Sequence, residues 1–378
     1  MFSINKPIVR AIDDYGKTNV KIDLFSCGGG VLAGARSIGS SFDVAVDIDP
    51  VLTSSASHNF PSTRHVLKDL STADEADVED WTQGRRVELV FGGPPCQGFS
   101  LIGRREADDP RRNMLWHYFR MVSLLRPRVF VMENVAGLAS PSTMPLLWHA
   151  IEAWTSDYEV LEPRILDASD YGAPTVRRRL FVVGYLPNET PPLSWEDLAR
   201  QPGGPNVRDA IGDLVGARRL PEAGAPRWRL DGRRRVSSYA ASLRDVCGSV
   251  DGMEPTSHTQ AVLDRFSEVR QGGTDPVGRY PRLSWTGKCP TLRAGTGSDR
   301  GSHQAIRPIH PDEDRVITVR EAARLQGFPD RHRFHPTKWH SFRMIGNSVA
   351  PPMAAALLNW IETSSGFYSR SDHLFAAE

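Results

Sequence analysis

Short apolar runs alternate with helical patterns along the first half of the chain. The runs are rich in valine, isoleucine and phenylalanine, which is typical of buried strands. Stretches between them, such as residues 114–125, repeat apolar residues at helical spacing. This alternation predicts an α/β fold with a doubly wound, mostly parallel sheet, which binds ligands at the carboxyl ends of its strands. The predicted strands cover residues 20–25, 43–49, 87–93, 128–134 and 178–186.

The pattern changes after about residue 187. Residues 187–226 contain seven prolines, and the chain remains irregular to about residue 312, with one helical run at 259–271. Helical order returns at residues 318–328 and 348–362, and we expect the last helix to pack on the first domain. The predicted parts are a first domain (1–186), a smaller irregular domain (187–312), a return segment that completes the first domain (313–362) and a frayed tail (363–378).

Composition excludes several classes of protein. No run of about 18 apolar residues predicts a membrane span, and the N-terminus lacks the apolar core of a secretory signal. Four scattered cysteines without a CxxC pair predict neither a disulfide framework nor a zinc site. We therefore expect a cytoplasmic protein that holds no metal, and we take a monomer as the default.

Charge is unevenly distributed although the net charge is only +1. Residues 200–244 contain ten arginines against four acidic residues. Such a basic segment inside a neutral protein indicates either a nucleic-acid footprint or an arginine-rich solvated surface.

A glycine-rich turn follows the first predicted strand. In "DLFSCGGGVLAG" (23–34), Gly28, Gly30 and Ala33 match G-x-G-x-x-A, and Asp47 and Asp49 close the second strand about 20 residues later. A carboxylate at that place can accept hydrogen bonds from ribose hydroxyls. The pattern favours an adenosine-containing cofactor over a purely structural turn, and it leaves NAD and S-adenosylmethionine both open.

One cysteine lies in a stiff polar loop, "FGGPPCQGFS" (91–100). A thiolate is a nucleophile, and dipoles or cations at a strand end can lower the pKa of a thiol such as Cys96. The alternative is a buried structural cysteine. Further on, Glu133 ends another strand, and Arg177 and Arg179 share one side of the strand after it. These arginines need anionic partners, which acidic side chains alone could supply.

Seven motifs occur in order across residues 21–357: "DLFSCGGG", "DID", "GGPPCQGFS", "ENV", "TVRRR", "REAARLQGFPD" and "GNSVAPP". On these motifs the chain resembles DNA cytosine-5 methyltransferases of the bacterial type. The resemblance does not extend to the tail or to the segment from about residue 187 to residue 300. It implies a Rossmann-like methyltransferase sheet with a target-recognition domain over about 187–312, S-adenosyl-L-methionine as cofactor and S-adenosyl-L-homocysteine as product. Double-stranded DNA is the implied substrate, and a separate restriction endonuclease is a candidate partner.

The resemblance also implies residue roles. Cys96 is the expected nucleophile, Glu133 and Arg177 are expected at the cytosine, and Arg179 is expected to order the site. The cofactor is expected at Phe25, Ser26, Gly28, Gly30, Asp47, Ile48, Asp69, Leu70, Pro94, Leu115, Asn347, Ser348 and Val349. The DNA is expected at Ser100, Arg104, Arg111, Thr291 and Leu292. In two departures from the family pattern, Thr175 replaces a glutamine and Asp47 a glutamate.

The reaction explains these residue types. Thiolate addition at cytosine C6 makes C5 enamine-like, so that C5 can take a methyl group. Charge then builds toward N3 and O2, where a protonated Glu133 and the Arg177 guanidinium would stabilise it. The base must leave the duplex to react, and we expect the loop after Cys96 to close on it. The sequence does not identify the base that removes the C5 proton.

Three rival functions stay open at this stage. An RNA methyltransferase would use the same chemistry, although the long arginine-rich insert suits duplex DNA. A binding module without catalysis is disfavoured by intact Cys96, Glu133, Arg177 and Asn347. A dehydrogenase is disfavoured because no group of residues suited to hydride transfer is evident.

Overall fold

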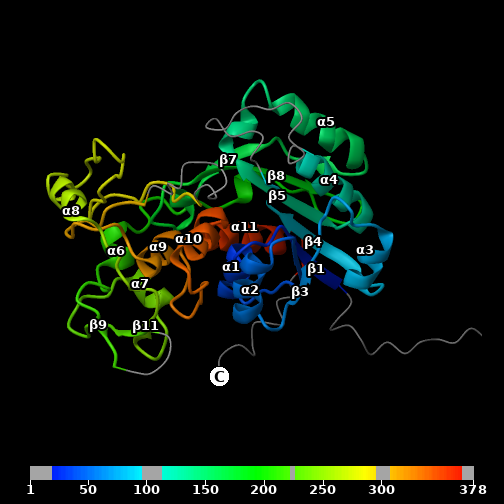
Figure 1. Ribbon diagram of the computed structural model, residues 1–378. Coiled ribbons are helices and arrows are strands. Elements are labelled where there is room, and N and C mark those ends of the chain that lie inside the picture. The colour runs from blue at the N-terminus through cyan, green and yellow to red at the C-terminus, as the bar shows by residue number, and fades with distance from the viewer. Residues whose placement is uncertain (1–18, 96–112, 222–225, 295–306, 368–378) are drawn as a thin grey trace, which may run out of the picture.

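A twisted eight-stranded sheet forms the centre of the molecule in the computed structural model (Figure 1). The structure describes residues 19–95, 113–221, 226–294 and 307–367. The strand order is β3-β2-β1-β4-β5-β8-β6, and β7 also pairs with β8. The strands are β1 Asn19–Leu24, β2 Val44–Asp47, β3 Arg64–Leu67, β4 Arg86–Gly92, β5 Val129–Val135, β6 Glu159–Val160, β7 Arg164–Asp167 and β8 Arg178–Tyr185.

The first five strands are parallel, whereas β6, β7 and β8 are joined by antiparallel pairings and β8 runs antiparallel to β5. The chain builds β1, β2 and β3 toward one edge and then crosses to β4 and β5 on the other side of β1. The order therefore reverses between β1 and β4. Ligands bind at such a reversal in open α/β sheets, so the predicted fold class and its expected ligand edge agree with the topology.

Helices cover both faces of the sheet, because successive strand residues point to opposite faces. On β4, Leu89 and Phe91 pack in the cluster that contains α1 and α11, and Val90 packs in the cluster that contains α4 and α5. Gly34 allows α11 to approach α1 closely, since a Cβ there would lie 2.7 Å from the Ala354 Cβ. The last helix thus packs against α1, which follows the first strand of the sheet.

The helices of the sheet region are α1 Gly30–Ser37, α2 Pro50–Asn59, α3 Glu75–Thr82, α4 Asn113–Leu125 and α5 Met144–Trp154. Those of the later chain are α6 Val207–Ile211, α7 Ser238–Leu243, α8 Gln260–Ser267, α9 Val319–Gln326, α10 Lys338–Asn347 and α11 Pro351–Ser364.

The irregular segment predicted at 187–312 carries α6, α7, α8 and a small antiparallel sheet in the order β11-β10-β9. These strands are β9 Arg218–Arg219, β10 Trp228–Arg229 and β11 Ser249–Val250. One apolar cluster runs from α6 and Trp228 through α9 to α1 and α11. The segment therefore shares a core with the rest of the chain.

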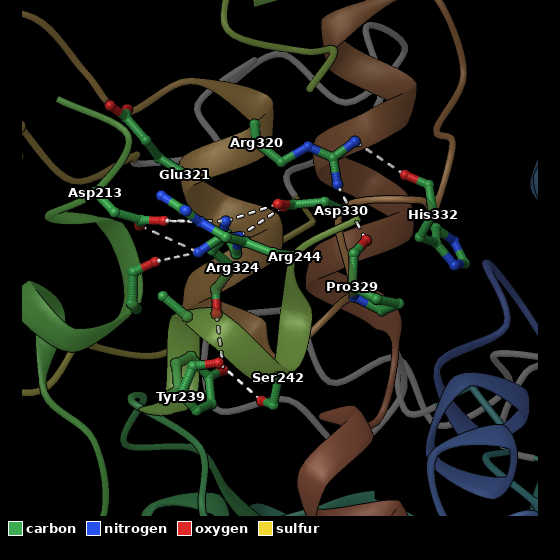
Figure 2. Close-up of polar contacts among 12 residues, drawn as sticks. Asp213, Tyr239, Ser242, Arg244, Arg320, Glu321, Arg324, Pro329, Asp330 and His332 are labelled. Atoms are coloured by element: carbon green, nitrogen blue, oxygen red, sulfur yellow. Dashed lines mark hydrogen bonds and ion pairs between the residues drawn. The ribbon is translucent and has the colours of Figure 1, made fainter. Parts of the chain in front are cut away.

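Helix α9 is buried along its whole length and carries charged residues that join the segments around it. Figure 2 shows Arg324 directed at two carboxylates: its Nε lies 2.6 Å from Asp330 Oδ1, and its Nη1 lies 3.3 Å from Asp213 Oδ1. Arg244 Nε also lies 2.8 Å from Asp213 Oδ2. A hydrogen-bonded charge network thus connects the irregular segment to the return segment.

None of the described helices is both long and apolar enough to cross a membrane.

Candidate active site

The glycine-rich turn after β1 is held against the return segment. Gly29 has a φ of +81°, which favours glycine. A Cβ on Gly30 would lie 2.4 Å from the Val349 carbonyl oxygen, and one on Gly28 would lie 2.9 Å from the Met344 Cβ. The turn and the segment Asn347–Val349 are therefore neighbours, as predicted, although they are distant in sequence.

Asp47 fastens the ends of β1 and β2 together. Its Oδ2 accepts from the Cys27 backbone N–H at 2.8 Å, and its Oδ1 accepts from the Asp49 N–H at 2.8 Å. Burial raises the pKa of Asp47, and the backbone hydrogen bonds oppose that rise. Asp49 caps α2 by accepting from Val51, and it pairs with Arg343 Nη1 at 2.7 Å. Asp47 therefore has a fixed orientation at the strand ends.

Other expected cofactor residues follow the ends of β2 and β3 or lie on α4. Ile48 is 63% exposed beside Asp47, which leaves a large apolar side chain open to a ligand. Asp69 accepts from the Ser71 N–H at 2.9 Å, and this bond lowers the pKa of Asp69. Leu70 and Leu115 are buried, so they can act through packing.

Buried polar atoms at the same edge lack partners. Ser26 is 5% exposed, and its Oγ forms no hydrogen bond to any described residue. Asp23 is 1% exposed with an unpartnered Oδ2, and burial raises its pKa well above the usual range. Unsatisfied buried polar groups are rare in native proteins. The exposed Ile48 side chain offers an apolar surface, and Ser26 Oγ and Asp23 Oδ2 offer hydrogen-bonding groups. Together they fit a ligand that has both a ring and polar groups.

The return segment has fixed geometry as well. Ser348 Oγ donates to the Met344 carbonyl at 2.8 Å, and Gln326 Nε2 donates to the Ser348 carbonyl at 3.1 Å. Phe25 has a positive φ of 58°, in line with a tight turn. Asn347 ends α10 with an exposed side chain. Neither Met344 nor Gln326 was predicted as a site residue, although Gln326 lies in the motif "REAARLQGFPD".

The chain after β4 runs beside the end of β5. A Cβ on Gly93 would lie 3.2 Å from Glu133 Oε2, and Asn134 Nδ2 donates to the Pro94 carbonyl at 3.2 Å. Pro94 is buried and Pro95 is the last described residue of this segment. The predicted residues Cys96, Ser100, Arg104 and Arg111 lie outside the described residues.

Glu133 is paired with Arg179. Their Oε1 and Nε atoms lie 2.9 Å apart, and both side chains are largely buried. Arg177 instead donates from Nη2 to the Gly346 carbonyl at 2.8 Å and from Nη1 to the Leu292 carbonyl at 3.3 Å. Glu133 and Arg177 were expected together at the cytosine, with Arg179 ordering the site. In the structure the ion pair of Glu133 is with Arg179, and Arg177 connects the residues before β8 to the return segment.

The segment around Thr291 is fastened to the residues before β8. Thr175 Oγ1 donates to the Cys289 carbonyl at 3.0 Å, and Thr291 Oγ1 donates to the Val176 carbonyl at 2.7 Å. The shorter Thr175 side chain therefore makes a defined contact where the family has glutamine. Leu292 is 3% exposed, so its side chain packs in the core and does not face solvent, where we expected DNA.

Across the residues that the structure describes, no group of three or more histidine, cysteine, aspartate or glutamate side chains could hold a metal ion.

Comparisons with known proteins give the family of the chain. The family described as "C-5 cytosine-specific DNA methylase" matches residues 20–363. The Type II methyltransferase M.XorII of Xanthomonas oryzae is 41% identical over 356 residues, covering 89% of this chain and 83% of that protein. M.DdeI of Desulfomicrobium norvegicum is 30% identical over 385 residues, covering 89% and 86%.

Solved structures give the same result. A DNA modification methyltransferase encoded within an E. coli prophage is similar with a TM-score of 0.77 and 34% identity, covering 92% of this chain and 99% of that one. The S. pombe Dnmt2 methyltransferase has a TM-score of 0.61 at 18% identity, covering 91% and 98%, which bears on the fold alone.

Proposed function

The chain belongs to the C-5 cytosine-specific DNA methylase family, and on that premise we propose how its residues divide the work of a DNA (cytosine-5) methyltransferase. The observation that carries the proposal is the Glu133–Arg179 pair beside Gly93, three residues before Cys96. A carboxyl group and a guanidinium then face the place where a nucleophilic thiolate would emerge.

S-adenosyl-L-methionine, when bound at the ends of β1 and β2, supplies an electrophilic methyl group. The Gly28–Gly30 turn would allow close backbone approach, and Asp47, whose orientation is set by two backbone N–H groups, would accept hydrogen bonds from the ribose. Ile48 offers an exposed apolar surface to the adenine ring. Ser26 Oγ has hydrogen-bonding capacity that no described residue uses. These residues fit an adenosine with an amino-acid tail.

At the cytosine, the Cys96 thiolate adds to C6 and the electron pair moves toward N3 and O2. The Glu133 carboxyl group can share a hydrogen bond with N3, and the Arg179 guanidinium can stabilise charge at O2. C5 would then form its bond to the methyl carbon while the methyl–sulfur bond of the sulfonium breaks and S-adenosyl-L-homocysteine is left. A base would next remove the C5 proton, and the thiolate would leave C6. We assign Arg177 to positioning, because its Nη1 and Nη2 groups donate to the backbone carbonyls of Leu292 and Gly346.

Duplex DNA is the proposed polymer, read by the segment 187–312. In its small sheet Arg229 lies directly opposite Arg218, and both are exposed. Like charges directly opposite each other are unfavourable in an antiparallel pair. A phosphate backbone on that face would remove the repulsion, which supports contact with a polyanion.

The relatives named Type II methyltransferases support a further proposal, that this enzyme methylates DNA as the modification partner of a separate restriction endonuclease. We also propose a cytoplasmic location, since both buried cysteines of the described chain are free thiols, and a monomer as the working unit.

The test is nucleoside mass spectrometry after incubation with S-adenosyl-L-methionine and unmethylated duplex DNA, with transfer RNA in a parallel reaction. We expect 5-methylcytosine in DNA and its loss in Cys96→Ser. Cys247→Ser is the matched control because Cys247 is exposed and far along the chain from the site motifs. Methylation of RNA alone, or full activity of Cys96→Ser, would contradict the proposal.

A further inference from the structure

A cleft of about 330 Å³ lies between the ends of α1 and α2 and the loop that joins α9 to α10. None of its lining residues belongs to the proposed active site. The lining includes three arginines, Arg36, Arg331 and Arg333, and two histidines, His58 and His332. No described residue that lines this arginine cleft is acidic. A concave surface with that lining attracts anions.

Local structure explains only one of the three arginines. Arg36 Nη2 donates to the Asn59 carbonyl at 2.7 Å, and its guanidinium lies 4.3 Å from the centre of the Phe60 ring. This is a favourable position for a cation, at the C-terminal end of α2. Arg331 and Arg333 are exposed and form no ion pair with any described residue. Burial and the charge of Arg331 lower the pKa of Arg36, so the guanidinium groups repel one another.

The loop is fixed in place without a ligand. Asn59 clamps the Arg333 backbone, accepting from its N–H at 2.9 Å and donating to its carbonyl at 2.8 Å. On the other side, Arg320 donates to the carbonyls of Pro329 at 3.2 Å and His332 at 3.0 Å (Figure 2). A cleft whose backbone is already ordered loses little entropy when it binds.

His332 supplies a second, independent sign of a ligand. The side chain lines the cleft, is 2% exposed, and has an Nε2 atom without a hydrogen-bond partner among the described residues. Figure 2 shows its ring directed away from the Arg324 network. Rings of Phe328 and Phe334 lie beside it, each with its centre 4.7 Å away. One ring nitrogen of His332 hydrogen-bonds the Gly28 backbone, so the unpartnered Nε2 of the neutral ring can accept a hydrogen bond from a ligand hydroxyl, such as the P–OH of a singly protonated phosphate.

We propose that the arginine cleft binds the phosphate group of a small phosphomonoester of about nucleotide size. One guanidinium group can form two parallel hydrogen bonds to the oxygens of a phosphate. A site with two or three guanidinium groups matches the double negative charge of a phosphate better than the single charge of a carboxylate. The volume is at the lower end for small-molecule pockets, which run from roughly 300 Å³ upward. Phe60 and His332 give an aromatic wall for the organic part. The proposal does not rest on methyl transfer.

Calorimetric titration of the full chain tests it, with adenosine monophosphate and with inorganic phosphate as probes in chloride buffer. The variant is Arg331→Gln with Arg333→Gln. The matched control is Arg64→Gln with Arg126→Gln, which also removes two exposed arginine charges, at surface pairs with Asp80 and Asp157 outside the cleft and outside the proposed DNA-reading segment. We expect saturable binding that weakens by about tenfold or more in the cleft variant and stays nearly unchanged in the control.

Three outcomes would overturn the proposal. Neither probe binds in a saturable way, the control variant loses as much affinity as the cleft variant, or the cleft variant weakens the binding of non-target duplex DNA but not that of either probe. A thermal melt of each variant separates lost binding from lost folding. His332→Phe, which keeps an aromatic ring but removes the unpartnered Nε2 acceptor, should also weaken binding, and unchanged affinity would remove His332 from the site.

Discussion

Glu133 on β5 and Arg179 on β8 form an ion pair with 2.9 Å between Oε1 and Nε. The strands are antiparallel neighbours, and Arg179 lies opposite Val135, two residues beyond Glu133. Residues two apart on a strand share a face. The sheet itself therefore sets the pair in place, at the strand end that adjoins Gly93.

Replacing Arg179 by lysine keeps the charge but removes the planar fork. We expect single-turnover methyl transfer to fall by roughly 10²-fold or more, because a donor aimed at developing charge is lost, with cofactor affinity nearly unchanged. Rapid-quench kinetics and equilibrium binding measure the two quantities. Arg178→Gln, an exposed neighbour, is the control. If Arg177→Lys slowed chemistry and Arg179→Lys did not, the two assignments would have to be exchanged.

Gly30→Ala should disturb the cofactor turn. The added Cβ would lie 2.4 Å from the Val349 carbonyl oxygen and 2.7 Å from the Ser348 Cβ, and overpacking costs about 1–3 kcal/mol. We expect a lower free energy of unfolding and weaker cofactor binding in the same variant. Gly232→Ala is the control, because a Cβ there meets nothing within 4 Å. Unchanged cofactor affinity in Gly30→Ala would show that residues 348 and 349 can move away from the added Cβ at little cost.

Arg324→Met tests the buried charge network of Figure 2. The substitution leaves the buried Asp330 and Asp213 carboxylates without their shared partner, and such losses cost about 3–5 kcal/mol. Arg126→Met breaks the exposed pair with Asp157, where we expect a loss of about 0–1 kcal/mol. Denaturant unfolding measures both. Equal effects would mean that burial adds nothing to the Arg324 pairing.

His332 predicts part of the acid sensitivity. Burial, and then the charge of Arg320, lower its pKa from 6.5 to about 3. Between these values the unfolded chain binds a proton that the folded chain does not, so stability is retained above about pH 6.5 and is lost as the pH falls toward 3. In His332→Phe the free energy of unfolding should depend less on pH, by about 1.4 kcal/mol per unit between pH 6 and 4. Parallel profiles of the two proteins would contradict this.

Thiol reactivity should separate the cysteines. Burial raises the pKa of Cys27 to about 12 and that of Cys289 further, whereas Cys247 is exposed. At pH 8 we expect iodoacetamide to alkylate Cys247 in the folded protein and to reach Cys27 and Cys289 only after unfolding. Peptide mass mapping gives the result. Rapid alkylation of Cys27 would mean that the turn after β1 opens readily.

The predicted strands agree with β1, β2, β4, β5 and β8 to within about two residues at most ends. Their apolar runs are long because both faces are buried. Strand β3 was not predicted, since "RHVL" is half exposed at the sheet edge and carries no apolar run. The short β6 and β7 have too few residues for a periodic pattern to appear.

The sequence by itself determined the strand–helix alternation, the turn residues and the order of the motifs, because each depends on residues that are near one another along the chain. Only the tertiary structure decided which motifs meet. Cys27 and Met344 are 317 positions apart, yet Cys27 Sγ lies 4.0 Å from the Met344 carbonyl oxygen. The antiparallel register of β8 places Arg179 beside Glu133, whereas Arg177 hydrogen-bonds the return segment at Gly346. Such pairings are fixed by long-range packing and register, which no local pattern encodes.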